Sequence, residues 1–392
     1  MEVNTLIDSM LLVKDGKYIH TCNLVVFLYQ GLYILTEINP WYETCRHINT
    51  DVYIGMDSLR LAENIVFKKG STALDLCSGT GIQGMLAAKS AKKVVSVEIN
   101  TKAAPVTQFN IMLNGLEDII ELRVGDLYSV LKDEKFDYIY ANPPFIPMLE
   151  DEGINYPICG AGGEDGTKIL KNIIDGAPKY LNENGKIIIF CQCLGDENEI
   201  FFNKKLEIMG SQFNWNVNAA ILDRVALRYH VQKLCDLTKL FNEEFDEDKF
   251  KNRMWKIYKG LSAKYLYSIV YDITSNCMEH SNYYLELYNK WDIDNIPEIV
   301  SEVSFEQDNH SFRVKVQNDY IGYFDNEALE IYEEVKKGIS IHDIAVNIFH
   351  KHQNDENYLV KYPGFSIGKC ECIVLNSCME MEQLGVIKSR VQ

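Results

Sequence analysis

Two prolines follow an asparagine at Asn142-Pro143-Pro144-Phe145, directly after a run of strand-forming residues. Each proline fixes its backbone φ angle and lacks an N–H group, so the backbone offers carbonyl acceptors without competing donors. The Asn142 amide oxygen and the Pro143 carbonyl oxygen can then accept both protons of one planar –NH₂ group. Such an arrangement orients the nitrogen lone pair and stabilises the positive charge that develops when nitrogen acts as a nucleophile. Phe145 is expected to add a flat apolar face. A plain proline-rich loop is the alternative interpretation, and the surrounding elements decide between the two.

A second group of candidate residues begins with the glycine-rich segment Asp75–Gly81, which separates an apolar run from a helix-like one. Gly79 and Gly81 allow a tight turn and a close approach of backbone to a ligand, and the following helix start offers free N–H groups. Glu98 lies about twenty residues further on, where a carboxylate can accept hydrogen bonds from ribose hydroxyls. Asp126 ends the next strand, where it can reach an adenine amino group. Each acid alone fits a solvated loop, but three at successive strand ends predict a nucleoside-binding site.

The elements needed to position these residues are visible as an alternation of strands and helices from about residue 71. Strands are predicted over Thr72–Leu76, Lys93–Glu98, Ile119–Val124, Phe136–Ala141, Lys186–Cys191, Trp215–Leu222 and Tyr265–Ile273, and helices over 82–90, 101–114, 167–181 and 197–209. This rhythm predicts an α/β fold in which helices cover both faces of a mostly parallel, doubly wound, seven-stranded Rossmann-like sheet. A mostly helical stretch of about residues 225–262 is then an insertion before the last strand.

The two ends of the chain differ from this pattern. Residues 1–50 read as a small β-rich extension, with an expected hairpin over Cys22–Thr36. The tail reads as an α+β domain with three helices followed by a short strand, an order that resembles a winged helix; the expected elements are Asn326–Lys337, Ile341–His350, Glu371–Leu384 and Val386–Lys388. We therefore expect three parts, namely 1–50, 51–275 and 276–392.

Taken together, Asp75–Gly81, Glu98, Asp126 and Asn142–Phe145 resemble the class I methyltransferases that use S-adenosylmethionine (SAM) and methylate amino nitrogens. The resemblance covers about residues 50–195. It implies SAM as the cofactor and methyl transfer to a nitrogen held by Asn142 and Pro143, with Phe145 beside it. The cofactor contacts that it implies are Asp75, Cys77, Gly79, Gly81, Glu98, Ile99, Asp126, Leu127 and Asn142.

Two further segments narrow the resemblance. Gly162-Gly163-Glu164-Asp165-Gly166 is similar to the Gly-Gly-x-Asp-Gly segment of HemK-like protein glutamine methyltransferases. Asp57-Ser58 resembles the segment that closes over the cofactor before the first strand. Gly79-x-Gly81-x-x-Gly84 also matches a dinucleotide-binding fingerprint, which makes a nicotinamide dehydrogenase a competitor. The asparagine–proline turn after the fourth strand favours methyl transfer.

Composition limits the partners. Lys and Arg number 39 against 56 Asp and Glu, a net charge of −17, which disfavours broad phosphate binding. We expect no signal peptide and no membrane span. Eleven scattered cysteines suggest reduced thiols and a cytoplasmic protein, and the Cys-x-Cys spacing at Cys191-Gln192-Cys193 and Cys370-Glu371-Cys372 predicts no metal site.

Three functions remain open. The first is a SAM-dependent N-methyltransferase that acts on a planar amide or amino nitrogen of a protein, a peptide or a small metabolite. The second is a methyltransferase for exocyclic amines of RNA or DNA, which would present a flipped base to Phe145. The third is a SAM-binding regulator with a winged-helix tail, against which the intact Asn142–Phe145 turn argues because binding alone needs no paired acceptors. The oligomeric state is left open.

Overall fold

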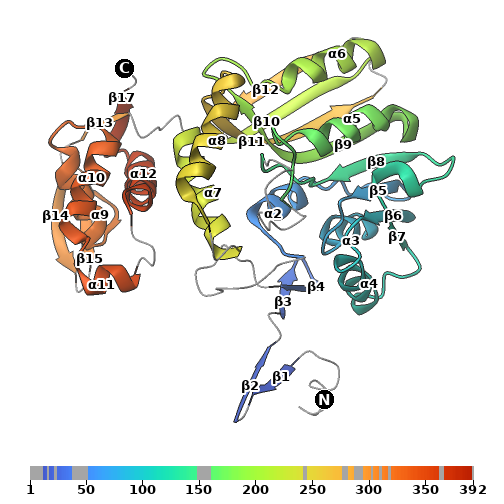
Figure 1. Cartoon of the computed structure of the whole chain (residues 1–392), viewed down its shortest axis with the longest axis horizontal. Helices are drawn as coiled ribbons and strands as arrows, with labels where there is room; N and C mark the ends of the chain where they lie inside the picture. The colour runs from blue at the N-terminus through green and yellow to red at the C-terminus, as the bar shows by residue number, and fades with distance from the viewer. Residues whose placement is uncertain are drawn as a thin grey trace. The chain divides into compact units, whose positions relative to one another are not determined.

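The structure is a computed structural model that describes residues 12–15, 17–21, 24–37, 52–147, 160–241, 245–275, 281–286, 295–301, 303–308, 311–316, 319–361 and 366–390. The chain forms two compact units (Figure 1): the first comprises Met1–Arg224 and Leu234–Leu287, the second Val225–Lys233 and Tyr288–Gln392. The division into three parts at residues 50 and 275 stays a prediction.

The centre of the first unit is one sheet of eight strands, and the predicted α/β class is confirmed. In spatial order the strands are β12 (Asn282–Glu286), β10 (Asn216–Ala226), β11 (Tyr265–Thr274), β9 (Leu181–Gly195), β8 (Phe136–Ala141), β5 (Thr72–Leu76), β6 (Lys93–Glu98) and β7 (Ile120–Val124). All seven predicted strands are present. The number seven was too low, because the short strand β12 adds to the sheet edge parallel to β10.

The order of the strands determines where a ligand can bind. Strand β5 pairs in parallel with β6 on one side and with β8 on the other. From β5 the chain continues to β6 and β7 on one side of the sheet and then returns to β8 on the other side. The strand order therefore reverses between β5 and β8. Open sheets of this kind bind ligands beside such a reversal, at the carboxyl ends of the strands. Strand β11 runs antiparallel to β9, in contrast to the parallel pairs from β9 through β8, β5 and β6 to β7.

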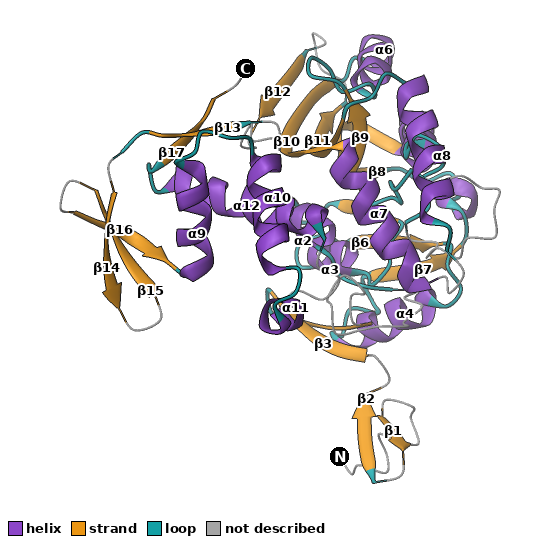
Figure 2. Ribbon diagram, turned by 60° about the vertical axis from the view of Figure 1, so that its left-hand side comes forward, coloured by secondary structure: helices purple, strands orange, loops and turns teal. Residues whose placement is uncertain are grey.

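Helices flank this sheet, as Figures 1 and 2 show. They are α2 (Met56–Ala62), α3 (Ile82–Ala88), α4 (Ala103–Leu113), α5 (Lys168–Tyr180), α6 (Asn203–Phe213) and α8 (Glu247–Gly260), with a 3₁₀ turn η1 (Leu127–Val130). Helix α7 (Leu227–Phe241) begins in the second unit and ends in the first. Helices α7 and α8 lie between β10 and β11 in the chain, where the insertion was predicted. Apolar residues of α2, α3 and α4 share one core with the sheet, among them Leu61, Met85, Leu86, Ile111, Tyr138 and Phe190.

The helix predicted over 197–209 begins six residues later than expected. The Asp196 carboxylate accepts hydrogen bonds from the backbone N–H groups of Asn198 and Glu199 at 2.8 and 2.9 Å. The chain then turns back, and the N–H of Phe201 donates to the Leu194 carbonyl. An aspartate that satisfies nearby backbone donors in this way favours a turn over a helix, so α6 starts only at Asn203.

Hairpin β3 (Leu24–Tyr29) and β4 (Leu32–Glu37) confirms the hairpin predicted over Cys22–Thr36. Asn110 of α4 accepts from the Leu35 N–H at 2.7 Å and donates to the Leu35 carbonyl at 2.9 Å. Asn114, one turn later, makes the same pair of bonds to Tyr33. These two side-chain amides therefore make hydrogen bonds to the backbone of β4 like those that a neighbouring strand would make. A second antiparallel pair, β1 (Leu12–Asp15) and β2 (Tyr18–Thr21), precedes the hairpin; the apolar run Thr5–Val13 lies mostly outside the described residues.

We expect Asn110→Ala to detach this hairpin from α4. Asn110 is fully buried, and the substitution leaves the Leu35 N–H and carbonyl without partners, which costs about 2–3 kcal/mol. Faster hydrogen exchange in the peptide that spans 24–37, together with easier urea unfolding, would show the effect. Asn114→Ala is the matched control, because its bonds to Tyr33 are exposed; an equal loss in both variants would contradict the explanation.

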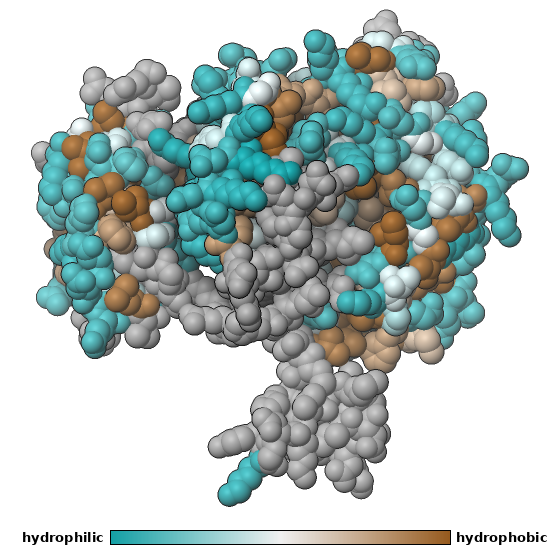
Figure 3. All heavy atoms as spheres, viewed as in Figure 1, coloured by the Kyte–Doolittle hydropathy of each residue, from teal (hydrophilic) through white to brown (hydrophobic). Residues whose placement is uncertain are grey.

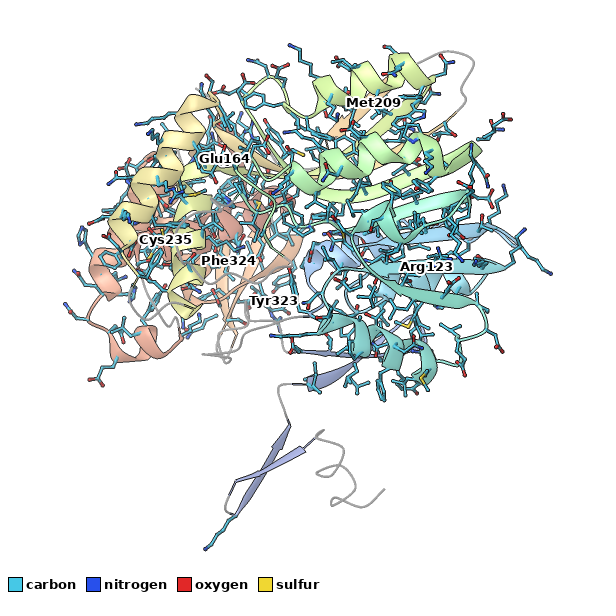
Figure 4. All side chains as sticks on the ribbon, turned by 45° about the vertical axis from the view of Figure 1, so that its right-hand side comes forward. Arg123, Glu164, Met209, Cys235, Tyr323 and Phe324 are labelled. Atoms are coloured by element: carbon cyan, nitrogen blue, oxygen red, sulfur yellow. The ribbon has the colours of Figure 1, made fainter. Side chains whose placement is uncertain are left out.

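The second unit combines strands with helices, as the α+β prediction requires. Its elements are β13 (Ile296–Ile299), β14 (Val303–Asp308), β15 (Ser311–Val316), β16 (Asp319–Phe324), α9 (Asn326–Val335), α10 (Ile341–His352), α11 (Glu356–Lys361), α12 (Ile367–Gln383) and β17 (Ile387–Arg390). Strands β14, β15 and β16 form an antiparallel sheet, and β17 pairs with β13. Phe324 is buried against Phe305 and Tyr332, whereas its neighbour Tyr323 is 62% exposed (Figure 4).

The described surface is mostly hydrophilic on the face drawn in Figure 3, in keeping with the acidic composition. Within the described residues, no helix combines the length and the apolar character that a membrane crossing requires.

Candidate active site

A cavity of about 190 Å³ lies at the carboxyl ends of β5, β6, β7 and β8. The predicted residues that line it are Cys77, Gly79, Glu98, Ile99, Asp126, Leu127, Asn142 and Pro143. Asp75, Gly81 and Phe145 do not line it. The structure thus brings together eight of the residues that the sequence predicted, from four separate loops.

The loop after β5 turns sharply at three left-handed residues: Cys77 (φ 58°), Gly79 (φ 53°) and Gly81 (φ 82°). Helix α4 holds this loop from outside, since Thr107 donates to the Gly79 carbonyl and Asn110 donates to the Thr80 carbonyl. Gly81 is the N-cap of α3 rather than a wall of the cavity. We predicted that Gly81 contacts the cofactor; in the structure Gly81 shapes the turn instead.

Asp75 lies below the loop instead of facing the cavity. Its side chain is buried, and Oδ2 accepts from the Gly84 N–H at 3.0 Å and from the Ser96 hydroxyl at 3.5 Å. A Cβ at Gly84 would lie 2.9 Å from that oxygen, which explains why a glycine stands there. Burial raises the pKa of Asp75 to about 7. The carboxyl group therefore supports the first turn of α3, and any effect on a ligand passes through that turn.

Glu98 ends β6 and lines the cavity. Its Oε2 accepts from the Gly79 N–H at 2.7 Å and its Oε1 from the Asn100 N–H at 2.7 Å, while burial raises the pKa of the carboxyl group. The same carboxylate therefore fixes the glycine loop and borders the space in which a ribose would lie.

We expect Glu98→Ala to weaken SAM binding about 10- to 100-fold, because one or more hydrogen bonds to a charged group are lost, at about 1.5–3 kcal/mol each. Isothermal titration calorimetry with SAM measures the change. Glu117→Ala removes an exposed carboxylate outside the cavity and is the control. Unchanged SAM affinity in Glu98→Ala would sink the assignment of the cofactor site.

Cys77 faces the cavity, but its chemistry is that of a neutral thiol. Burial and the nearby carboxylates Glu98, Asp75 and Asp126 raise the pKa of the thiol well above its ordinary value. A thiolate nucleophile is therefore disfavoured at this position.

Asn142 is the polar group at the end of β8 that faces the cavity. Its Nδ2 donates to Asp57 Oδ2 at 2.8 Å, and it lies 3.5 Å from the Ser58 hydroxyl oxygen. Its Oδ1 is buried and has no hydrogen-bond partner among the described residues. A buried acceptor without a partner costs free energy unless something fills the site, so this oxygen marks the place where a donor is missing.

The aromatic face expected of Phe145 stays a prediction. Its ring is half-buried and packs edge-on against Phe190 at the border of the apolar core, with centroids 5.7 Å apart and planes at 63°. The walls of the cavity near Pro144 are instead Ala161 and Ile169.

The glycine-rich segment Gly162–Gly166, which contains Glu164 (Figure 4), supports the turn from behind. The Ile146 N–H donates to the Gly160 carbonyl, and the Gly162 N–H donates to the Ile146 carbonyl, both at 2.9 Å. A Cβ at Gly162 would lie 2.8 Å from the Phe145 backbone, and one at Gly166 only 2.3 Å from the Phe145 carbonyl oxygen. Both positions therefore require glycine for a close backbone approach.

Several lining residues outside the predicted segments carried no signal of their own in the sequence: Val52, Tyr53, Gln83, Ala161 and Ile169. Asp57 and Ser58 were noticed only through a resemblance. Helix α2 begins beside the end of β8, and this neighbourhood joins parts of the chain that are 85 residues apart. Short-range patterns do not reveal such a contact.

Comparisons with known proteins agree with this geometry. The methyltransferase small domain family matches residues 54–205. A Methanocaldococcus jannaschii protein, provisionally named a protein N5-glutamine methyltransferase, is 36% identical over 157 residues, which are 39% of this chain and 77% of that protein. The release factor glutamine methyltransferase of Thermodesulfovibrio yellowstonii is 33% identical over 32% of this chain and 48% of its own length. The ribosomal protein uL3 glutamine methyltransferase of Bordetella pertussis is 33% identical over 30% and 42%.

The chain thus spans most of the first relative and less than half of the other two. Among solved structures, the M. jannaschii tRNA m1G37 methyltransferase aligns with a TM-score of 0.39 and 17% identity over 65% of this chain and 55% of that one. The long alignment with the first relative, the family match and the strand order all concern the same part of the molecule. On this evidence the chain belongs to the HemK-like class I SAM-dependent methyltransferases, a family of N-methyltransferases.

Proposed function

We propose that this protein transfers the methyl group of SAM to the side-chain amide nitrogen of a glutamine in a protein or peptide. The observation that carries the proposal is the buried, unpartnered Oδ1 of Asn142 at the cavity wall. A primary amide supplies the donor that this oxygen lacks. The glutamine methyltransferases named above, which share the matched region, support the choice of an amide over an amine.

The cavity residues fit the cofactor. Glu98 offers acceptors for ribose hydroxyls, Asp126 offers one for the adenine amino group, and the loop at Gly79 lets backbone approach closely. When bound, SAM supplies an electrophilic methyl group on a sulfonium. Cys77, Ile99 and Leu127 would complete the walls around it.

The chain's own contribution to the reaction is to hold the acceptor nitrogen. Asn142 Oδ1 and the Pro143 carbonyl accept the two protons of the planar –NH₂ group, which fixes the direction of the nitrogen lone pair. The same two oxygens stabilise the positive charge that grows on nitrogen during transfer. The extra proton leaves after the transfer, so this geometry requires no strong general base.

The test uses SAM with a radiolabelled methyl group, the purified full-length protein and lysate of the host cell, treated in parallel with nuclease and with protease. We expect label that survives nuclease and is lost to protease, and mass spectrometry should place the added methyl group on a glutamine. Asn142→Ala is the negative control. Label that follows nucleic acid would overturn the proposal in favour of exocyclic-amine methylation, which the net charge of −17 disfavours.

A further inference from the structure

The two ends of an asparagine side chain have almost the same shape but opposite hydrogen-bonding roles. The amide nitrogen donates two hydrogen bonds, whereas the oxygen only accepts. If the Asn142 amide rotated by 180°, its –NH₂ group would face the acceptor and repel the –NH₂ group it is meant to hold. The function proposed above therefore needs something that fixes the orientation of this amide.

Asp57 supplies that constraint. An ionised carboxylate accepts hydrogen bonds and donates none, and Asp57 Oδ2 accepts from Asn142 Nδ2 at 2.8 Å. Burial raises the pKa of Asp57, and this hydrogen bond opposes that rise by stabilising the ionised form. The Ser58 hydroxyl oxygen lies 3.5 Å from the same nitrogen, and it also receives the Gly55 N–H at 3.4 Å. The nitrogen end of the amide is thus directed toward α2, and the oxygen end is left for the cavity.

The position of the Asp57 carboxylate is itself determined by its surroundings. It folds back over Gly55, the N-cap of α2, so closely that a Cβ at Gly55 would lie 2.2 Å from Asp57 Oδ1. Gln83 of α3 donates to the Ser58 carbonyl at 3.1 Å and ties the first turn of α2 to the helix that follows the cofactor loop. Glycine at position 55 and glutamine at position 83 therefore hold the carboxylate where it meets Asn142.

We infer that Asp57 is a positioning residue for methyl transfer: it fixes the Asn142 amide with its oxygen toward the acceptor nitrogen. This inference rests on the proposed function, since it assigns Asn142 the role of acceptor. It extends that function to a residue 85 positions away in the chain. Asp57 acts through Asn142 and does not itself bond to the reacting nitrogen.

A double-mutant cycle tests the inference, with initial rates of label transfer to the protein fraction of the lysate at saturating SAM. Asp57→Ala should lower the rate about 10- to 100-fold in the wild-type background, because the reacting group is misplaced. In the Asn142→Ala background the same change should have an effect of about twofold or less, because the group through which Asp57 acts is absent. Equal effects in both backgrounds would overturn the inference and assign Asp57 to cofactor binding or to folding.

Nuclear magnetic resonance gives a readout that needs no acceptor. In protein labelled with ¹⁵N-asparagine, the Asn142 side-chain amide is identified by its loss in Asn142→Ala. Asp57→Ala should shift these amide resonances toward those of exposed asparagines and speed their exchange with water. Unchanged resonances would overturn the inference even if glutamine methylation were established. Conversely, a lysate without labelled protein would sink the proposed function and leave this measurement standing.

Two further variants separate positioning from loss of folding. Asp57→Asn keeps an acceptor oxygen in a side chain of the same shape, so it should methylate faster than Asp57→Ala; a rate no higher would count against the inference. Asp118→Ala removes an exposed carboxylate outside the cavity and should retain the wild-type rate and amide resonances.

Discussion

Replacing Asn142 with alanine is expected to lower the rate of methyl transfer about 10²- to 10³-fold, the effect of removing one preorganised group that stabilises developing charge. SAM affinity should change far less than the rate. The reason lies in the geometry: Oδ1 of Asn142 is the buried, unpartnered acceptor at the cavity wall, whereas Glu98, Asp126 and the glycine loop line the part assigned to the cofactor. Single-turnover rates with labelled SAM and calorimetry with SAM measure the two quantities separately.

Asn64→Ala is the matched control for this variant. Asn64 is an exposed asparagine that donates to the Arg60 carbonyl at the end of α2, outside the cavity. It should retain the wild-type rate and SAM affinity. If Asn142→Ala lowered the rate and the SAM affinity by the same factor, or lowered neither, Asn142 would not be the group that holds the acceptor.

The parts of the site that the sequence predicts well are those in which one short segment determines the geometry. Strand β5 is buried on both faces and reads as an apolar run, and the glycines that follow it adopt left-handed φ angles that other residues rarely adopt. Glu98 is the last residue of the next strand, β6, and Asp126 lies two residues after the end of β7. Since parallel strands end at one edge of the sheet, the strand pattern alone is enough to bring these residues together.

The parts that the sequence does not predict depend on contacts between distant segments. Phe145 was expected to face the acceptor; the sequence did not show that its half-buried ring also contacts Phe190 on the neighbouring strand. Asp75 looks like a ligand contact because it stands near a strand end, yet its carboxyl group accepts a hydrogen bond from the Gly84 N–H in the first turn of α3. Both contacts join segments that are separated in the sequence, so short-range patterns do not reveal them.

Strand β12 and helix α6 show the same limit for the fold. Strand β12, Asn282–Glu286, contains the strand-forming residues Tyr283, Tyr284 and Leu285, but it is short and lies outside the alternation of strands and helices from which the sheet was predicted; the edge of β10 supplies its pairing. The start of α6 depends on one aspartate that stabilises a turn, which competes with the helical pattern of the residues that follow. Local propensity therefore located most elements of the sheet but missed strand β12 and placed the start of α6 too early.

Gly166→Ala is expected to lower the rate of methyl transfer about 10²-fold, because a displacement of about 1 Å near the reacting groups has an effect of that size. Gly166 has a left-handed φ of +76°, and an added Cβ would lie 2.3 Å from the Phe145 carbonyl oxygen. That carbonyl is backbone, so the clash is relieved only if the chain after Pro143 and the segment that carries Gly166 move apart. The substitution should therefore disturb the acceptor turn while Glu98 and the glycine loop remain in place.

Gly70→Ala is the control that separates the clash from the backbone strain. Gly70 has nearly the same φ, +75°, but an added Cβ meets nothing within 4 Å. Both variants should lose about 1 kcal/mol of stability for placing alanine in the left-handed region, and Gly166→Ala should lose more because of the clash; thermal unfolding checks this. Only Gly166→Ala should slow methyl transfer. If the two variants slowed it equally, strain in the fold would be the cause, and the support of the turn by Gly162–Gly166 would have no part in catalysis.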